Sequence, residues 1–289
     1  MSFRISFLAK STKTLQNFGN RFFLSMIISY SLLSFLTIVA FAGNTSEKAE
    51  KTADSPSGIS NNEGLQSHWD YMGIEGPEHW GMLTEKYMTC ETGERQSPIN
   101  ITMPHHGEHR QKLVFHYQTS QLHEMNNGHT IQVSHGSGCR VDLNDRKYQL
   151  RQFHFHTPSE HHIEGKAFPM EMHLVHQDET GHVLVLAVMM ATDAPQPVLS
   201  KLWKWLPEQL GQEVSIPLEV KLTDILPTNT SHYAYSGSLT TPPCSEGVQW
   251  IILKEPMHAT QQDVDQFVQI IGLNARPIQT REGRHIDED

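Results

Sequence analysis

A stretch with two histidines at alternate positions carries the clearest chemical signal in this sequence. His154 and His156 occur in the run QFHFHTPSE, whose alternating pattern predicts a β-strand. Side chains two positions apart on a strand lie on the same face, so both imidazoles can bind one metal ion. His173, in a second strand-like run, EMHLVH, supplies a third ligand if the two strands are neighbours. Three histidines with an open fourth position predict a catalytic Zn²⁺ site.

Chance is the alternative explanation of the H-x-H pair, because the chain contains 19 histidines. His105, His106 and His109 are interpreted as surface residues, since they occupy a polar loop where no strand is expected to fix them. Two motifs of other zinc hydrolases are absent from the sequence. No H-E-x-x-H occurs, and Pro158 stands where an H-x-H-x-D-H motif needs aspartate.

The charge of the chain and its first residues bear on its partners and its destination. A net charge of -10 and a pI near 6.0 argue against binding to nucleic acid, which requires a basic surface. Residues 1–42 combine early basic residues with an apolar run that ends in Ala-Phe-Ala, which is typical of a cleaved signal for export to the periplasm or the medium. The alternative is an uncleaved membrane anchor, because the apolar run is long enough to span a bilayer. Membrane contact is expected only if this segment is retained.

The rest of the chain predicts a linker and one domain. Residues 43–65 are small and polar, which favours a flexible linker, and the domain is expected at 66–285. Runs rich in β-branched and aromatic residues, separated by turn residues, predict a mainly β fold of the α+β class. We expect a large, mostly antiparallel twisted central sheet with short peripheral helices. The expected strands are 113–117, 130–134, 140–143, 148–156, 170–176, 183–190 and 248–253, and the expected helices are 197–206 and 261–271.

Several blocks of sequence resemble one known family. The run QFHFHTPSEHHIEGKAFPMEMHLVH at 152–176 is similar to the zinc-site segment of the alpha-class carbonic anhydrases, especially the bacterial form with Thr-Pro after the second ligand. Three distant blocks agree with the same family in the same order: GPEHW at 76–80, RQSPINI at 95–101 and YSGSLTTPP at 235–243. The match covers nearly the whole domain.

This resemblance implies the alpha-carbonic-anhydrase fold, a Zn²⁺ cofactor and the reversible hydration of carbon dioxide to bicarbonate and a proton by zinc-hydroxide attack. By resemblance, Thr240 accepts a hydrogen bond from that hydroxide and donates one to Glu160, while the Thr240 backbone N–H meets the forming bicarbonate. The alternative for Thr240 is a strand-end threonine that only caps a turn.

Further residues are expected to support the zinc ligands and to form the substrate pocket. Ligating histidines usually bond a fixed acceptor through their other nitrogen, and Gln152 and Glu171, each two residues before a histidine, can share its face. For His156 the resemblance implies the backbone carbonyl of Asn274. His161 and His176 are expected to be buried, hydrogen-bonded and not ligands. The pocket residues implied by the resemblance are Val175, Val185, Leu239, Thr241 and Trp250, of which the apolar ones could equally be plain core.

Proton release calls for a group that titrates near neutral pH. His129, in the turn Asn127-Gly128-His129, matches the proton-shuttle position of the family, and Tyr71 matches a tyrosine that holds the water chain of the site. An exposed turn histidine with no catalytic role would give the same sequence.

The cysteines Cys90, Cys139 and Cys244 allow three disulfide pairings. The resemblance to exported family members implies the pairing of Cys90 with Cys244. Two rival functions remain: a binding module, as in family members that have lost a zinc histidine, and an esterase that uses the same zinc site. The sequence leaves the oligomeric state open, a homodimer included.

Overall fold

This computed structural model of the protein describes residues 68–106 and 111–289. All of them belong to one compact unit, Asn62–Asp289. The predicted export signal at 1–42, the predicted linker at 43–65 and His109 lie outside the described residues. Within the described ranges, no helix has the length and apolar character needed to cross a bilayer.

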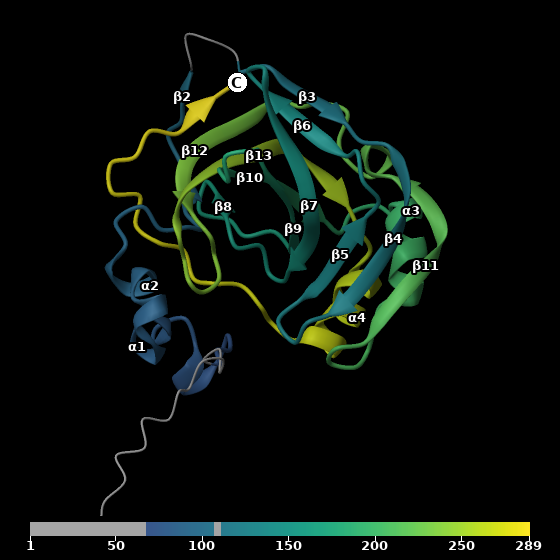
Figure 1. The fold of residues 1–289 in the computed structure, drawn as a ribbon, viewed down its shortest axis with the longest axis horizontal. Coiled ribbons are helices and arrows are strands. Elements are labelled where there is room, and N and C mark those ends of the chain that lie inside the picture. Colours follow the sequence, from purple (N-terminus) through teal and green to yellow (C-terminus); the bar gives the residue numbers. More distant parts are fainter. Residues whose placement is uncertain (1–67, 107–110) are drawn as a thin grey trace, which may run out of the picture. The chain divides into compact units, whose positions relative to one another are not determined.

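A twisted sheet of 12 strands dominates this unit (Figure 1). Its strands follow the order β11-β4-β5-β7-β9-β10-β13-β12-β14-β2, with β6 beside β7 and β3 beside β6. Most neighbours are antiparallel, whereas β10 and β13 are parallel, as are β14 and β2. The strands of the sheet are β2 (His105–His106), β3 (Leu113–His116), β4 (Thr119–Asn126), β5 (Ile131–His135), β6 (Arg140–Leu143), β7 (Arg146–His156), β9 (Met170–Gln177), β10 (Val183–Ala191), β11 (Glu213–Lys221), β12 (His232–Ser238), β13 (Glu246–His258) and β14 (Asp287–Glu288). A separate parallel pair consists of β1 (Asn100–Ile101) and β8 (His162–Ile163).

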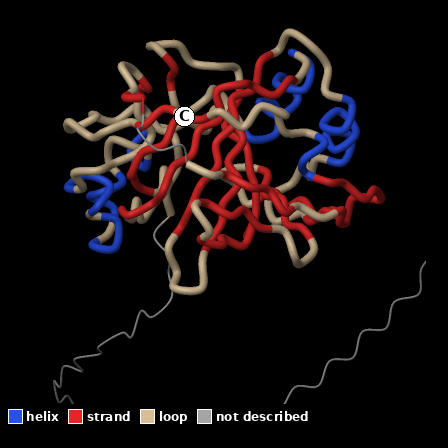
Figure 2. Tube along the Cα trace, turned by 90° about the horizontal axis from the view of Figure 1, so that it is seen from above, coloured by secondary structure: helices blue, strands red, loops and turns tan. Residues whose placement is uncertain are grey.

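Short helices flank the strands (Figure 2). Helix α3 (Pro197–Leu202) continues as a 3-10 turn, and α4 (Gln261–Ile271) begins at a capping box in which Thr260 and Asp263 bond each other's backbone N–H. The predicted mainly β fold, its strands and its two helices are therefore confirmed. The remaining helical elements are α1 (Trp80–Leu83), α2 (Thr89–Thr92) and the 3-10 turns Gly73–Glu75, Glu85–Tyr87, Trp203–Trp205 and Leu222–Asp224.

The sheet is covered on both faces, so its central strand β10 is apolar throughout. Leu184 and Leu186 contribute to a large core that also includes Phe267 of α4, whereas Val185 and Ala187 contribute to a smaller core on the opposite face. Alternate residues of a strand point to opposite faces, and here each face meets other apolar side chains. The histidines expected to bind metal lie on the face of the smaller core.

A β-bulge in β7 allows one strand to serve both the core and the site. The pairing of β7 with β9 shifts between Leu150 and Gln152, which leaves Arg151 as the extra residue. Before the bulge, Tyr148 and Leu150 belong to the large core, and after it the odd-numbered residues Phe153 and Phe155 do. The change of alternation turns three polar residues toward the other face: Gln152, His154 and His156.

Besides the two-residue strands, three longer strands, β4, β11 and β12, were not predicted, because their sequences lack clear apolar alternation. Strand β4 buries a charged residue, Glu124, and β11 contains Pro217 and is largely exposed. The prediction that no strand fixes His105 and His106 was wrong: these exposed residues form β2 because their backbone pairs with β14. Strand β14 also shows that the sheet extends beyond residue 285, where the domain was expected to end.

Candidate functional site

The two histidine-bearing strands are direct neighbours in the sheet. Strand β7 pairs with antiparallel β9, and His154 stands opposite His173. The ring centroids of His154 and His156 lie 5.0 Å apart, and the ring of His173 lies 5.3 Å from the first and 4.6 Å from the second. One nitrogen of each ring lies within 4.8 Å of the others. The three imidazoles therefore converge on one point.

Each of these rings uses its other nitrogen in a hydrogen bond. The bonds join Gln152 Oε1 to His154 Nδ1 (2.8 Å), the Asn274 carbonyl oxygen to His156 Nδ1 (2.8 Å) and Glu171 Oε1 to His173 Nε2 (2.7 Å). These are the three acceptors expected from the sequence. The nitrogens left to converge are Nε2 of His154, Nε2 of His156 and Nδ1 of His173, and the hydrogen bonds fix the orientation of all three rings.

Burial favours the neutral, metal-binding form of two of these histidines. Loss of hydration lowers the pKa of His154 well below its ordinary value, and the neighbouring histidines lower it further. Burial also lowers the pKa of His156, against the opposing effect of Glu160. Burial disfavours the charged form of His173 as well, but the charge and hydrogen bond of Glu171 outweigh it and raise the pKa of this histidine.

A zinc ion fits this donor set, because three imidazole nitrogens, from the half-buried His154 and the buried His156 and His173, face one point, and a three-histidine set leaves a fourth tetrahedral position open. His156 Nε2 is buried without a hydrogen-bond partner among the described residues, as expected for an atom whose partner is a metal. A second cluster comprises His161, Glu171 and His173. In this cluster each histidine already bonds Glu171 Oε1 at 2.7 Å.

The two other buried histidines near the site are hydrogen-bonded, as expected. His161 bonds Glu171 through Nδ1 and the Tyr235 hydroxyl through Nε2, both at 2.7 Å. His176 bonds the Tyr117 hydroxyl at 2.7 Å, and its burial lowers its pKa to about 3. Both rings are fully buried and support the sheet around the site.

A cavity of about 320 Å³ opens beside the converging histidines. His154, His173 and Gln152 are among the residues that line it. All the residues expected to form a substrate pocket line it as well: Val175, Val185, Leu239, Thr241 and Trp250, together with Thr240. The cavity therefore combines an apolar wall with the metal-binding nitrogens, an arrangement suited to a small, weakly polar molecule.

Glu160 and Thr240 come from segments far apart in the sequence. Glu160 is buried, and its Oε1 accepts a hydrogen bond from the backbone N–H of Arg276 at 2.9 Å. Its Oε2 lies 3.6 Å from Nε2 of His156 and has no hydrogen-bond partner among the described residues. Thr240 is 5% exposed and lies in the cavity wall. The carboxylate thus retains one oxygen free to accept a hydroxyl hydrogen.

His129 is half-buried and does not line the cavity. Its ring stacks on Trp69, with centroids 3.7 Å apart and planes 7° from parallel, and burial lowers its pKa. The side chain of Asn274 donates to the His129 carbonyl at 2.9 Å, and the Asn274 carbonyl accepts from His156. Asn274 therefore links the His129 backbone to the ring of His156.

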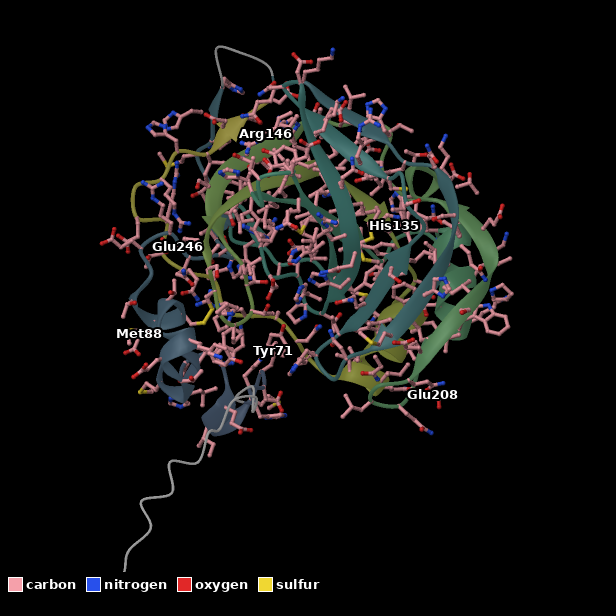
Figure 3. All side chains as sticks on the ribbon, in the orientation of Figure 1. Tyr71, Met88, His135, Arg146, Glu208 and Glu246 are labelled. Carbon is pink, nitrogen blue, oxygen red and sulfur yellow. A yellow bond between two sulfur atoms is a disulfide. The ribbon has the colours of Figure 1, made fainter. Side chains whose placement is uncertain are left out.

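Tyr71 lies on the side of the unit where the N-terminal helices are drawn (Figure 3). Its ring packs edge-on against Trp69 and Trp80, at centroid distances of 5.5 and 5.8 Å. It lines a separate hollow with Ala275 and Pro277, not the cavity beside the metal-binding histidines. Burial raises the pKa of its hydroxyl well above the ordinary value, with Glu160 adding to the effect, so the group stays protonated.

The structure contains the expected disulfide between Cys90 and Cys244, whereas Cys139 is a buried free thiol. Sequence reasoning missed Trp69, which stacks on His129. It also missed the hydrogen bond from Arg276 to Gln96, two residues that bond Glu160 and the Cys244 carbonyl, respectively. Gln96 lies within the RQSPINI block, so the block itself was the available signal.

Comparison with known proteins agrees with this geometry. A family model described as eukaryotic-type carbonic anhydrase matches residues 75–288. The carbonic anhydrase of Pectobacterium atrosepticum is 41% identical over 76% of this chain and 90% of its own, and that of Neisseria gonorrhoeae is 41% identical over 78% and 89%. A solved structure of the alpha-carbonic anhydrase of Thermovibrio ammonificans, with the inhibitor sulfanilamide, is 40% identical with a TM-score of 0.74, covering 76% of this chain and 99% of that one. A three-histidine cluster beside an apolar cavity, on a twisted sheet shared with these relatives, shows that the chain belongs to the eukaryotic-type, or alpha-class, carbonic anhydrase family.

Proposed function

We propose that this carbonic anhydrase is a zinc enzyme that hydrates carbon dioxide reversibly, with His154, His156 and His173 as the metal ligands. The observation that carries the proposal is the convergence of three oriented imidazole nitrogens beside a cavity that His154 and His173 line together with apolar side chains. Zinc, when bound, supplies the Lewis acidity that makes hydroxide available for attack near neutral pH; carbonic anhydrase is the standard example of this effect.

Thr240 and Glu160 orient the reactants. An ionised carboxylate only accepts hydrogen bonds, so Glu160 Oε2 can bond Thr240 only by accepting its hydroxyl hydrogen. The Thr240 oxygen is then left to accept a hydrogen bond from the attacking hydroxide, which aims a lone pair of that hydroxide at the carbon. The Thr240 backbone N–H donates to the oxygen that gains charge as bicarbonate forms.

The apolar wall holds the gas. Carbon dioxide has no hydrogen atom to donate, so a pocket formed by Val175, Val185, Leu239 and Trp250 accommodates it without leaving a protein group unpaired. Thr241 lines the same cavity and adds a polar side chain to it.

His129 carries the released proton to solvent. Its position beside Asn274 and its stacking on Trp69 support a relay at the edge of the site, since an imidazole can both accept and donate a proton, although burial lowers the pKa of this ring. Tyr71, kept protonated by burial, supports the ordered water between the site and the relay.

Residues 1–42 direct export to the periplasm or the medium. The disulfide between Cys90 and Cys244 supports this destination, because such bonds form and persist in oxidising compartments. Membrane attachment follows only if the segment is retained, which N-terminal sequencing of the exported protein determines.

Stopped-flow hydration of carbon dioxide by the purified exported protein tests the proposal. Activity should disappear when a chelator removes zinc and return when zinc is added back. Hydration that survives complete removal of the metal would contradict the zinc mechanism. A fully zinc-loaded protein without hydration activity would instead indicate a binding module.

A further inference from the structure

The residues of the RQSPINI block bond both ends of the segment that carries Thr240. Ser97 exchanges two hydrogen bonds with Ser238: its N–H donates to Ser238 Oγ at 2.9 Å, and the Ser238 N–H donates to Ser97 Oγ at 3.1 Å. Gln96 Nε2 donates to the Cys244 carbonyl at 3.1 Å and to Glu246 Oε1 at 3.0 Å. The turn at 239–243 is therefore fixed from before and after.

Arg276 connects this arrangement to Glu160. Its guanidinium donates through Nη1 to Gln96 Oε1 at 2.9 Å and to the Ser97 carbonyl at 2.8 Å, and through Nη2 to the Cys90 carbonyl at 2.9 Å. Its own backbone N–H donates to Glu160 Oε1 at 2.9 Å. Arg276 thus bonds the Glu160 carboxylate through its main chain, and it bonds Gln96 and Ser97, which hold the Thr240 turn, through its side chain.

The guanidinium of Arg276 forms no ion pair with any described residue, although the side chain is only 2% exposed. Burying a charge on neutral acceptors is costly, and burial accordingly lowers the pKa of Arg276 to about 10. What arginine provides in return is a planar fork of donors in fixed directions. Apolar side chains of similar size would stabilise the fold as well as this buried arginine does. We therefore infer that the guanidinium serves to hold its hydrogen-bond partners in fixed positions.

Two glycines leave room for these contacts. A Cβ at Gly93 would collide with Gln96 Nε2 and Glu246 Oε1, and a Cβ at Gly237 would collide with Ser97 Oγ. The absence of a side chain at these two positions therefore lets Gln96 and Ser97 approach the backbone closely enough to form their hydrogen bonds.

We propose that Gln96 and Arg276 are positioning residues for the hydration step: together they set the separation between the Glu160 carboxylate and the Thr240 turn. The proposal rests on the roles proposed above for Glu160 and Thr240. The hydrogen bond proposed between those two groups would join segments about 80 positions apart in sequence that no strand pairing connects. A displacement of about 1 Å in such a contact can reduce a rate by about 10²-fold. The disulfide is a second, covalent link to the same turn, because it also holds Cys244.

Two substitutions of Gln96 separate its links. Gln96→Glu keeps an oxygen for Arg276 but loses the donor to the Cys244 carbonyl, and Gln96→Met loses both. We expect Gln96→Glu to lower kcat/KM for carbon dioxide by about 10-fold and Gln96→Met by more, with full zinc content. The matched control is Gln266→Met, because Gln266 Nε2 also donates to a backbone carbonyl at 3.1 Å, that of Trp203, far from the site. This control should retain kcat/KM.

The ratio of kinetic constants distinguishes positioning from loss of structure. Partial unfolding lowers the concentration of active enzyme and reduces kcat and kcat/KM equally, whereas a misplaced Thr240 impairs the hydration step that kcat/KM reports and affects a kcat limited by proton release less. Equal loss of both constants in the Gln96 variants, or none, would overturn the proposal. If Thr240→Ala is also harmless, the proposed function of Thr240 fails instead.

A double-mutant cycle with the disulfide tests whether the two links share the task. Gln96→Met is combined with Cys90→Ser and Cys244→Ser, and kcat/KM is measured at a temperature well below unfolding. If each link holds the turn when the other is absent, the combined loss should exceed the product of the separate losses. A combined loss equal to that product would show that Gln96 and the disulfide act independently, against the proposal.

Discussion

Oε2 of Glu160 lies 3.6 Å from Nε2 of His156, and neither atom has a hydrogen-bond partner among the described residues. Both atoms are buried, and a buried polar atom without a partner costs about 1–3 kcal/mol. The proposed mechanism gives each a different partner: the metal for the nitrogen and the Thr240 hydroxyl hydrogen for the oxygen. The proposed metal ligand His156 and the proposed acceptor of the Thr240 hydroxyl, Glu160, are therefore direct neighbours.

Replacing His154, His156 or His173 by alanine should remove both bound zinc and hydration activity, because two imidazoles hold the ion poorly. Metal analysis and stopped-flow kinetics on each variant provide the measurement. His182→Ala is the control, since His182 is largely exposed and outside the cluster. Full zinc occupancy in all three variants would mean that the metal binds elsewhere.

Thr240→Ala should retain zinc and lose about 10²-fold or more in kcat/KM, as expected when a preorganised orienting group is removed. Thr240→Ser keeps the hydroxyl and the backbone N–H and should recover most of the activity. Zinc content is measured alongside the kinetics. An unchanged kcat/KM in Thr240→Ala would show that another residue orients the hydroxide.

His129→Ala should lower kcat much more than kcat/KM, because proton release is separate from attack on carbon dioxide. Imidazole added as a buffer should restore kcat by replacing the missing ring. His123→Ala, an exposed histidine on β4, serves as the control. A loss that no buffer restores would make His129 a structural residue.

Cys90→Ser should lower the melting temperature, because the bond to Cys244 closes a loop of 154 positions. The chain-entropy model assigns such a loop about 4–5 kcal/mol, an upper estimate for measured gains. Cys139→Ser, which removes only a free thiol, should have a smaller effect. Non-reducing peptide mapping of exported protein gives the direct check, and a bridge that contains Cys139 would refute the pairing.

Glu124 should make the stability of the fold depend on pH. Burial raises the pKa of this carboxyl from 4.5 to about 8, and its Oε2 has no hydrogen-bond partner among the described residues. Between these pH values the unfolded chain is ionised at this position while the folded chain keeps the proton. The free energy of unfolding should therefore fall as pH rises from about 5 to 8, by about 3 kcal/mol from this group.

Glu124→Gln should remove this slope and stabilise the protein at pH 8, as chemical denaturation at several pH values would measure. Glu213→Gln, on the exposed neighbouring strand β11, should leave the slope unchanged. An identical pH dependence in Glu124→Gln and the unmodified chain would show that the carboxyl ionises without a penalty.

The histidine pattern and the strands around it could be predicted from the sequence, because alternation and β-branched residues directly encode a strand and its faces. Strand β4 could not, since Glu124 occupies an inward position that an apolar residue normally fills. The bulge at Arg151 leaves no local mark, because its cause is the pairing of β7 with β9. The contacts of Arg276 with Gln96 and Cys90 join residues more than 170 positions apart and depend on the completed fold.

The opposition of His154 and His173 across β7 and β9 makes the metal site a reporter of correct folding. A slip of one residue between these strands would turn one of the two histidines to the opposite face and destroy the three-nitrogen cluster. Misaligned molecules would thus be unable to retain zinc, even if their sheet were otherwise complete. With the zinc ligands proposed above, the ratio of bound zinc to protein in a sample saturated with zinc should therefore report the fraction of chains whose central strands are in register, before any activity is assayed.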